Sequence, residues 1–292
     1  MPSDVARLFD AMAGSYDELE SWSTHLYARL HAILRAQLQP PADGRPRRSL
    51  DVGCGTGFQT ALLEDLGYAS HGVDIAPGLV AIARQRLGTS ALALGDVEAL
   101  PYGDEAFDVV SCCGSTLSFV ERADRALGEI GRVLRPGGLL LLECEHKWSL
   151  DLVWALGSSL TGDSLDYRVG PGDVWRQVAR PLREGCWLRY PVPSSNGSVA
   201  SMRLRLYTRS ELRGLIGAAG LTVRRMWGIH MLTNLIPSTV LHRDRLGAWL
   251  ARCYGALCRL DGRLERFTSA HQIANSLVVL AEKLPSGSSV PR

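Results

Sequence analysis

The sequence has very little lysine, little net charge and no long hydrophobic stretch. Lysine occurs only at Lys147 and Lys283, and we attribute the arginine bias to genomic base composition because arginine is spread along the whole chain. The 32 basic and 30 acidic residues leave a net charge of +2, whereas a dedicated nucleic-acid-binding protein carries a clustered positive excess. No stretch approaches the roughly 20 apolar residues of a membrane-spanning helix, and no secretory signal follows Met1. These absences predict a cytoplasmic protein without a nucleic-acid or integral-membrane partner.

Cysteine patterns typical of zinc sites and disulfide frameworks are also missing. The seven cysteines include no Cys-x-x-Cys pair. Cys112 and Cys113 are adjacent, so in a strand their side chains would point to opposite faces. We therefore expect reduced thiols and no metal site. The chain has 292 residues, 46% of them hydrophobic, which is enough for one large domain with a substantial core.

Hydrophobic periodicity predicts an α/β fold behind a helical N-terminal region. Residues 1–46 form a predicted helical lid that ends in a segment rich in proline and glycine. Beyond it, short apolar runs alternate with helical segments, which is typical of a Rossmann-like, mostly parallel sheet flanked by helices. The expected strands are residues 49–52, 69–73, 91–94, 107–112, 139–143, 202–207, 221–227 and 276–281. The expected core helices are residues 57–66, 77–87, 122–133 and 208–219.

Two segments interrupt this alternation and predict insertions. Residues 146–200 contain four of the seven tryptophans, and we interpret this aromatic-rich segment as a lid over an acceptor. Residues 201–229 return to the core pattern, and residues 230–275 form a second, helical insertion. Within it, residues 246–264 predict a long amphipathic helix that could pack in a homodimer or touch a membrane surface. The remaining predicted units are the ligand-binding core, the final strand and a polar tail, at residues 47–145, 276–283 and 284–292.

A glycine-rich turn at residues 51–57 is the strongest functional motif. The sequence Asp-Val-Gly-Cys-Gly-Thr-Gly follows a predicted strand and opens a predicted helix. Glycine lets the backbone turn tightly and approach a ligand closely. The G-x-G-x-G spacing differs from the G-x-G-x-x-G of dinucleotide-binding proteins. Asp51, two residues before Gly53, would repel a pyrophosphate and attract an ammonium group.

Two further acidic residues follow the next two predicted strands. Asp74 ends the second strand, where a carboxylate can accept hydrogen bonds from both hydroxyl groups of a ribose. Asp96 closes the third strand, where it can accept an adenine amino group while Val97 covers the ring. Because ligands bind at the carboxyl ends of parallel strands, the three acids predict a pocket for an adenosine that carries an amino acid and no phosphates.

The order of these motifs resembles the class I S-adenosylmethionine-dependent methyltransferases, and within them the small-molecule group. The resemblance rests on the glycine-rich turn and on Val-Asp, Gly-Asp-Val-Glu-Ala-Leu-Pro, Phe-Asp-Val-Val and Leu-Arg-Pro-Gly-Gly at residues 73–74, 95–101, 107–110 and 134–138. It is strong over residues 50–145 and extends weakly to 9–17 and 207–228. It implies a seven-stranded sheet with an antiparallel last strand, S-adenosylmethionine as the cofactor and a small molecule as the methyl acceptor.

The resemblance also implies roles for individual residues. Asp51 would hold the amino group of the methionine part. Asp74 and Ile75 would bind the ribose and adenine, and Asp96 and Val97 would bind the adenine. The remaining implied contacts come from the glycine-rich turn, the end of the fourth strand and the N-terminal lid, and are Gly53, Cys54, Gly55, Gly57, Cys113 and Tyr16.

Methyl transfer is an in-line displacement at a carbon that a sulfonium has already activated. Positioning and exclusion of water therefore contribute most of the catalysis, although an acceptor hydroxyl gains about 10²–10⁴-fold from a general base. His146 follows the fifth strand and His230 the sixth, so we expect both near the carboxyl edge of the sheet as candidate bases. Glu143 is a third candidate.

The sequence leaves the acceptor and several competing functions open. We expect methylation at oxygen, and the aromatic-rich insertion favours an apolar or aromatic acceptor such as a phenol, quinol, polyketide or lipid. An amino-group methyltransferase of nucleic acids would carry an Asn/Asp-Pro-Pro-aromatic stretch where this chain has Cys-Cys-Gly-Ser at residues 112–115. A protein methyltransferase, a non-catalytic protein that binds S-adenosylmethionine and a nicotinamide-dependent oxidoreductase also stay open. The spacing of the glycine-rich turn argues against the oxidoreductase.

Overall fold

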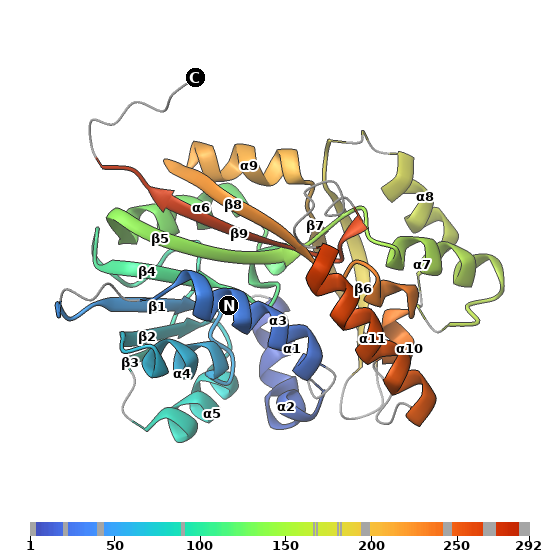
Figure 1. Ribbon diagram of the computed structural model, residues 1–292, viewed down its shortest axis with the longest axis horizontal. Coiled ribbons are helices and arrows are strands. Elements are labelled where there is room, and N and C mark those ends of the chain that lie inside the picture. The colour runs from blue at the N-terminus through green and yellow to red at the C-terminus, as the bar shows by residue number, and fades with distance from the viewer. Residues whose placement is uncertain are drawn as a thin grey trace.

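A seven-stranded sheet forms the centre of the molecule (Figure 1). The computed structural model describes residues 4–19, 23–39, 44–88, 91–165, 167, 169–179, 181, 183–193, 199–241, 247–264 and 273–285. The strand order is β3-β2-β1-β4-β5-β9-β8, and β9 runs antiparallel to both of its neighbours while the other pairs are parallel. The strands of this sheet are β1 (Arg48–Val52), β2 (Ala69–Asp74), β3 (Ala91–Leu94), β4 (Phe107–Cys112), β5 (Leu134–Glu145), β8 (Leu221–Ile229) and β9 (Ser276–Lys283). The predicted seven-stranded, mostly parallel sheet is confirmed.

Helices cover both faces of the sheet. α3 and α4 pack on one face, and α6 and α9 pack on the other. Within β5, Leu141 joins the cluster on the α3 side while Leu140 and Leu142 join the cluster on the α6 side. Burial of both faces is the reason that the central strands read as continuous apolar runs. The helices are α1 (Asp4–Met12), α2 (Tyr16–Leu19), α3 (Ser23–Gln37), α4 (Phe58–Asp65), α5 (Pro77–Leu87), α6 (Ala123–Val133), α7 (Asp151–Leu160), α8 (Pro171–Ala179), α9 (Arg209–Ala218), α10 (Ser238–Leu241) and α11 (Ala248–Leu264), with 3-10 turns η1 (Ala13–Ser15), η2 (Thr116–Phe119) and η3 (Thr233–Leu235).

Local sequence signals determine where several of these helices begin. α5 starts at Pro77, where the missing N–H has no partner to lose. α9 starts after Thr208, whose side-chain oxygen accepts the N–H of Glu211, an N-cap worth about 1 kcal/mol. Among the described residues, each helix is too short or too polar to span a lipid bilayer.

Both insertions leave the sheet at the carboxyl ends of strands. The segment after β5 forms α7, α8 and a hairpin of β6 (Cys186–Pro193) with β7 (Val199–Leu206). The segment between β8 and β9 forms η3, α10 and α11. The Nε1–H of Trp154 donates to the carbonyl of Asn234 over 2.9 Å, so α7 is tied to η3. The two insertions therefore meet beyond the same edge of the sheet (Figure 1).

The structure differs from the predicted elements in three places. β5 begins at Leu134 instead of residue 139, because Leu134 already pairs with Phe107 before the register shifts. β7 pairs with β6 and stays outside the main sheet, since the chain just before it supplies an antiparallel partner that the sequence did not suggest. The predicted apolar face of α11 is split: Tyr254 is buried, whereas Trp249 is 76% exposed.

Candidate active site

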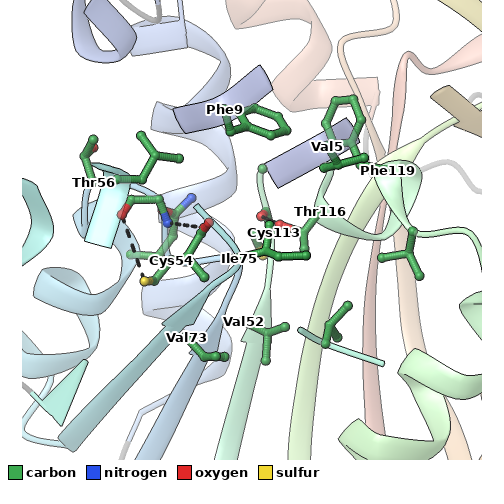
Figure 2. A pocket seen from close by; sticks show the side chains of 18 of the residues that line it. Val5, Phe9, Val52, Cys54, Thr56, Val73, Ile75, Cys113, Thr116 and Phe119 are labelled. Carbon is green, nitrogen blue, oxygen red and sulfur yellow. Dashed lines mark hydrogen bonds between the residues drawn. The ribbon is translucent and has the colours of Figure 1, made fainter. Parts of the chain in front are cut away.

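A cavity of about 980 Å³ lies at the carboxyl ends of β1, β2, β3 and β4. Its floor consists of the loops that follow these strands, and its cover consists of side chains from α1, α2 and α3. Figure 2 shows Val52 and Val73 below the cavity and Phe9, Val5 and Phe119 above it. The N-terminal helices thus complete a site that the sheet alone would leave open.

The glycine-rich turn folds tightly at the end of β1. Gly53, Gly55 and Gly57 all have positive φ angles, of 71°, 52° and 92°, which a residue with a Cβ rarely adopts. The N–H groups of Gly53 and of Cys54 both donate to the carbonyl of Val73, at 2.8 and 3.1 Å. Gly53, Cys54 and Gly55 line the cavity, so the predicted turn is where the sequence placed it.

The carboxylate of Asp74 has unused acceptor sites for two further hydrogen bonds. It is 8% exposed, and burial raises the pKa of its carboxyl group. One oxygen accepts the N–H of Gly55 and the other accepts the N–H of Ala76, each at 2.9 Å. Because an ionised carboxylate has about four acceptor sites, both oxygens keep capacity for a pair of hydroxyl groups in the cavity. Ile75 lines the cavity beside it.

The third acidic position lies at the far side of the cavity. Asp96 and Val97 both line it, and the carboxylate of Asp96 accepts the N–H of Glu98 at 2.9 Å. This hydrogen bond orients the side chain, because it fixes one carboxylate oxygen against the backbone two residues on. Asp74 and Asp96 therefore reach the same cavity from successive strand ends, as the sequence predicted.

Two of the predicted cofactor residues, at the two ends of the turn, do not line the cavity. Asp51 is 1% exposed and accepts the hydroxyl proton of Thr60 at 2.8 Å; burial raises its pKa to about 7. A Cβ on Gly57 would approach the side chain of Leu87 to 2.9 Å. Direct contact of either residue with a ligand stays a prediction, and their visible contacts support the turn.

Aromatic side chains of the N-terminal region cover the turn. The ring of Tyr16 lies 3.8 Å from the position of a Cβ on Gly55. Phe9 makes edge contacts with Tyr16 and with Phe119, at centroid distances of 6.2 and 5.3 Å. The hydroxyl group of Thr56 donates to Asp17 at 2.7 Å, which ties the start of α2 to the turn. The predicted position of Tyr16 at the cavity is thereby supported by geometry.

The loop after β4 forms the remaining wall. Cys113 lines the cavity and is 3% exposed, and burial raises the pKa of its thiol. The next two residues, Gly114 and Ser115, both have positive φ angles. Glu143 accepts the N–H of Ser115 at 2.7 Å, and Glu145 accepts its hydroxyl proton at 2.9 Å. Two carboxyl groups of β5 thus hold this strained loop in place.

The two predicted base candidates are buried outside the cavity lining. His146 is 2% exposed, and its Nδ1 lies 3.0 Å from the carbonyl of Ala274; burial lowers its pKa to about 4. His230 is 6% exposed, and its Nδ1 lies 3.3 Å from the hydroxyl group of Thr233. Neither residue is among those that line the cavity. A catalytic role for either stays a prediction.

The sequence reasoning missed His31, which does line the cavity. Its imidazole stacks on Tyr27 of the same helix at a centroid distance of 5.7 Å. Its Nε2 is buried and has no hydrogen-bond partner among the described residues. Burial and the neighbouring Arg35 lower its pKa, which favours the neutral form of the ring. The only sequence signal was the pair Tyr27 and His31 at i, i+4 spacing, which places both on one face of a helix.

The cavity fits S-adenosylmethionine in its charge and in its hydrogen-bond acceptors. Six acidic residues and one arginine line it, and such a surplus of carboxylates favours a cationic ligand. The turn exposes backbone beside Gly55, and Asp74 offers paired acceptors to a ribose. Among the described residues, no group of three or more His, Cys, Asp or Glu side chains could hold a metal ion.

Comparisons with known proteins agree with this assignment. A methyltransferase domain family matches residues 50–142. The malonyl-acyl-carrier-protein O-methyltransferase of Serratia marcescens is 31% identical over 280 residues, with 94% of each chain covered. That of Methylococcus capsulatus is 38% identical over 276 residues, covering 92% of this chain and 90% of the relative. The solved structure of the 4+2 cyclase SpnF superposes with a TM-score of 0.58 at 22% identity and 96% coverage of both chains, which shows the shared fold. The chain therefore belongs to the class I S-adenosylmethionine-dependent methyltransferases, and S-adenosylmethionine is its cofactor.

Proposed function

We propose that this methyltransferase esterifies the free carboxylate of a short acyl group held as a thioester on an acyl carrier protein. The full-length similarity to two malonyl-acyl-carrier-protein O-methyltransferases carries this proposal. The reaction forms a bond between a carboxylate oxygen and the methyl carbon and breaks the bond from that carbon to sulfur. The products are a methyl ester and S-adenosylhomocysteine. The acceptor is small and is methylated at oxygen.

The side chains around the cavity support an acceptor that needs no general base. A carboxylate is ionised at neutral pH, whereas a hydroxyl acceptor would have to lose a proton. His146 and His230 are absent from the cavity lining, and His31 is the one histidine among the lining residues. A neutral imidazole can donate one hydrogen bond. We assign His31 to the acceptor, where its N–H would orient the attacking oxygen.

The residues of this chain contribute position and exclusion of water. S-adenosylmethionine supplies a methyl group activated by the sulfonium, and its positive charge offsets the acidic lining for an incoming carboxylate. Asp74 and Asp96 hold the nucleoside, and Cys113 lines the methionine end. Phe9 and Phe119 close the top of the cavity, which keeps water from the reacting centre. The insertion at residues 146–200 serves as the acceptor lid, and the enzyme works in the cytoplasm.

A product assay with methyl-labelled S-adenosylmethionine tests the proposed function. The acceptors are malonyl groups on a holo carrier protein and on pantetheine, with a phenol and a quinol as aromatic competitors. We expect label in a base-labile methyl ester, because a carboxylate acceptor gives an ester that hydroxide cleaves. Activity should survive EDTA. Label that appears on the phenol or quinol alone would contradict the carboxylate and favour the aromatic acceptor expected from the sequence.

A further inference from the structure

We propose that the outward face of α11 is the surface on which an acidic carrier protein docks. The inference rests on the proposed function, because the carrier delivers the acceptor to the cavity described above. The outward face is defined by five residues, Trp249, Arg252, Arg259, Leu260 and Arg263. It lies in the second insertion, outside the cofactor cavity.

The five residues, which we call the stripe, lie on one side of the helix. At 3.6 residues per turn they fall within an arc of roughly 100°. Trp249 is 76% exposed and Leu260 is 42% exposed, and the three arginines are exposed as well. Large exposed apolar side chains surrounded by polar residues are typical of protein interaction sites. Tryptophan and arginine are the residue types that most often dominate binding energy at such sites.

The opposite face of α11 attaches the helix to the turn that follows β8. The one acidic residue within α11 lies on this buried face. Asp261 is 6% exposed and accepts the N–H groups of Met231, Leu232 and Thr233 at 3.1, 2.7 and 3.2 Å. Tyr254 is buried on the same side. The helix cannot rotate without breaking these hydrogen bonds, so the stripe is held outward with three positive charges and no negative one.

The connectivity of the chain places this stripe beyond the edge of the sheet at which the cavity opens. Residues 230–275 lie between the carboxyl end of β8 and the start of β9, and β8 runs parallel to β5 because both are antiparallel to β9. The cavity opens at the same ends of β1 to β4. α11 therefore lies beyond the edge that carries the cavity (Figure 1). A carrier bound there would present its long prosthetic arm to the acceptor side of the site.

The positive charge of the stripe favours a carrier protein over a second copy of this chain as the binding partner. In a two-fold symmetric dimer the same patch meets itself, so the arginines of one copy would face those of the other. Carrier proteins are small, acidic and helical, and their charge complements the stripe. Complementary charge raises the association rate and lowers the apparent KM more than it changes the chemical step.

Charge reversal of the stripe tests the proposal in the native, full-length enzyme. We compare R252E/R259E/R263E and Trp249→Ala with the matched control Arg213→Glu, an exposed arginine on α9. With the malonyl carrier protein as acceptor, the triple variant should have a KM at least 10-fold higher than the native enzyme at low salt. Added salt should reduce this difference in KM between the two enzymes. With malonyl pantetheine as acceptor, kcat and KM should stay within 2-fold. The control should change neither.

Each contrary outcome overturns a specific part of the proposal. An equal loss on both acceptors would show that α11 supports the fold and not docking. No loss on either, with native activity intact, would show that the carrier binds elsewhere. Loss of a native dimer in the triple variant would assign the stripe to an interface between copies. Binding to phosphatidylglycerol vesicles that depends on the arginines, without a change in KM for the carrier, would assign it to a membrane surface. If the native enzyme methylates neither acceptor, the proposed function itself is wrong.

Discussion

At the scale of single residues, buried carboxyl groups of the same chemistry have different functions because they lie in different places. Asp74 lines the cavity and keeps acceptor capacity for a ligand. Asp51 is hydrogen-bonded to Thr60 and does not line the cavity. Glu143 and Glu145 hold the loop that carries Cys113. Because these carboxyl groups contact different parts of the protein, mutations at these positions should have different effects.

Replacing Asp74 with asparagine should weaken cofactor binding. The amide keeps one oxygen but turns the other acceptor into a donor, so it must lose a backbone hydrogen bond and one ribose hydroxyl. We expect the Kd for S-adenosylmethionine to rise about 10- to 100-fold, since a hydrogen bond to a charged group is worth about 1.5–3 kcal/mol. Calorimetric titration measures this. Asp104→Asn, an exposed position, is the control, and equal affinities for the two variants would contradict the assigned role.

Replacing His31 with glutamine should affect the acceptor and spare the cofactor. We expect kcat/KM for the acceptor to fall about 10-fold or more, because an oriented hydrogen bond to the reacting oxygen is lost. The Kd for S-adenosylmethionine should change less than 3-fold. His71→Gln is the matched control, because this histidine is also partly buried but contacts the ring of Phe107 away from the cavity. A selective loss of cofactor affinity would place His31 at the methionine end instead.

Glu145 should make the enzyme less stable at alkaline pH. Burial, followed by the charge of Glu143, raises its pKa to about 8, far above its value in an unfolded chain. Over the pH range between these two pKa values, the folded state therefore keeps a proton on Glu145 that the unfolded chain has released. The stability that this proton contributes is lost as the pH rises through about 8. In urea unfolding between pH 6 and 9, Glu145→Gln should show a smaller decline of the unfolding free energy. Asp65→Asn, on the exposed side of α4, should leave the decline unchanged.

At the scale of elements, Asp261 links α11 to the turn that follows β8. Its carboxylate accepts three backbone N–H groups and the hydroxyl proton of Thr233. These hydrogen bonds help to fix the orientation of α11, and with it the outward stripe.

Replacing Asp261 with alanine should loosen this insertion while the sheet stays folded. Buried N–H groups left without partners cost about 1–3 kcal/mol each, so we expect faster hydrogen exchange at residues 231–235 and along α11. Exchange in β1 and β4 should be unchanged, because those strands lie in the sheet core. Asp151→Ala on α7 is a useful comparison, since it also accepts a backbone N–H in this region. Uniform acceleration across the chain would show that the insertion does not open independently.

At the scale of the whole molecule, the cofactor should bind between the sheet edge and the N-terminal helices and hold them together. A ligand at about 100 times its Kd stabilises the folded state by about 2.7 kcal/mol. We expect S-adenosylhomocysteine to raise Tm by several degrees and to slow hydrogen exchange in α1 and α3 as well as in the loops after β1 and β2. A rise in Tm without protection of α1 and α3 would show that the N-terminal helices do not cover the bound cofactor.

Membership of a fold family leaves the reaction undecided, because the same fold occurs in a 4+2 cyclase. The assignment to methyl transfer comes from the full-length similarity to named methyltransferases and from a cavity whose acids follow successive strands. The pattern of apolar runs predicted the sheet well. It did not predict the β6–β7 hairpin, because a hairpin outside the core has no periodic signal that distinguishes it from a core strand.

The sequence by itself determined which edge of the sheet binds the cofactor. Gly53, Asp74 and Asp96 lie at or just after the carboxyl ends of β1, β2 and β3, and a parallel sheet must bring such positions to one edge, so local pattern and topology sufficed. Only the tertiary structure decided which histidine reaches the cavity. His146 and His230 also lie at the carboxyl ends of strands, yet both are buried and their rings contact residues of the second insertion. His31 lines the cavity because α3 packs over the end of β4, a contact between distant segments that no local spacing encodes.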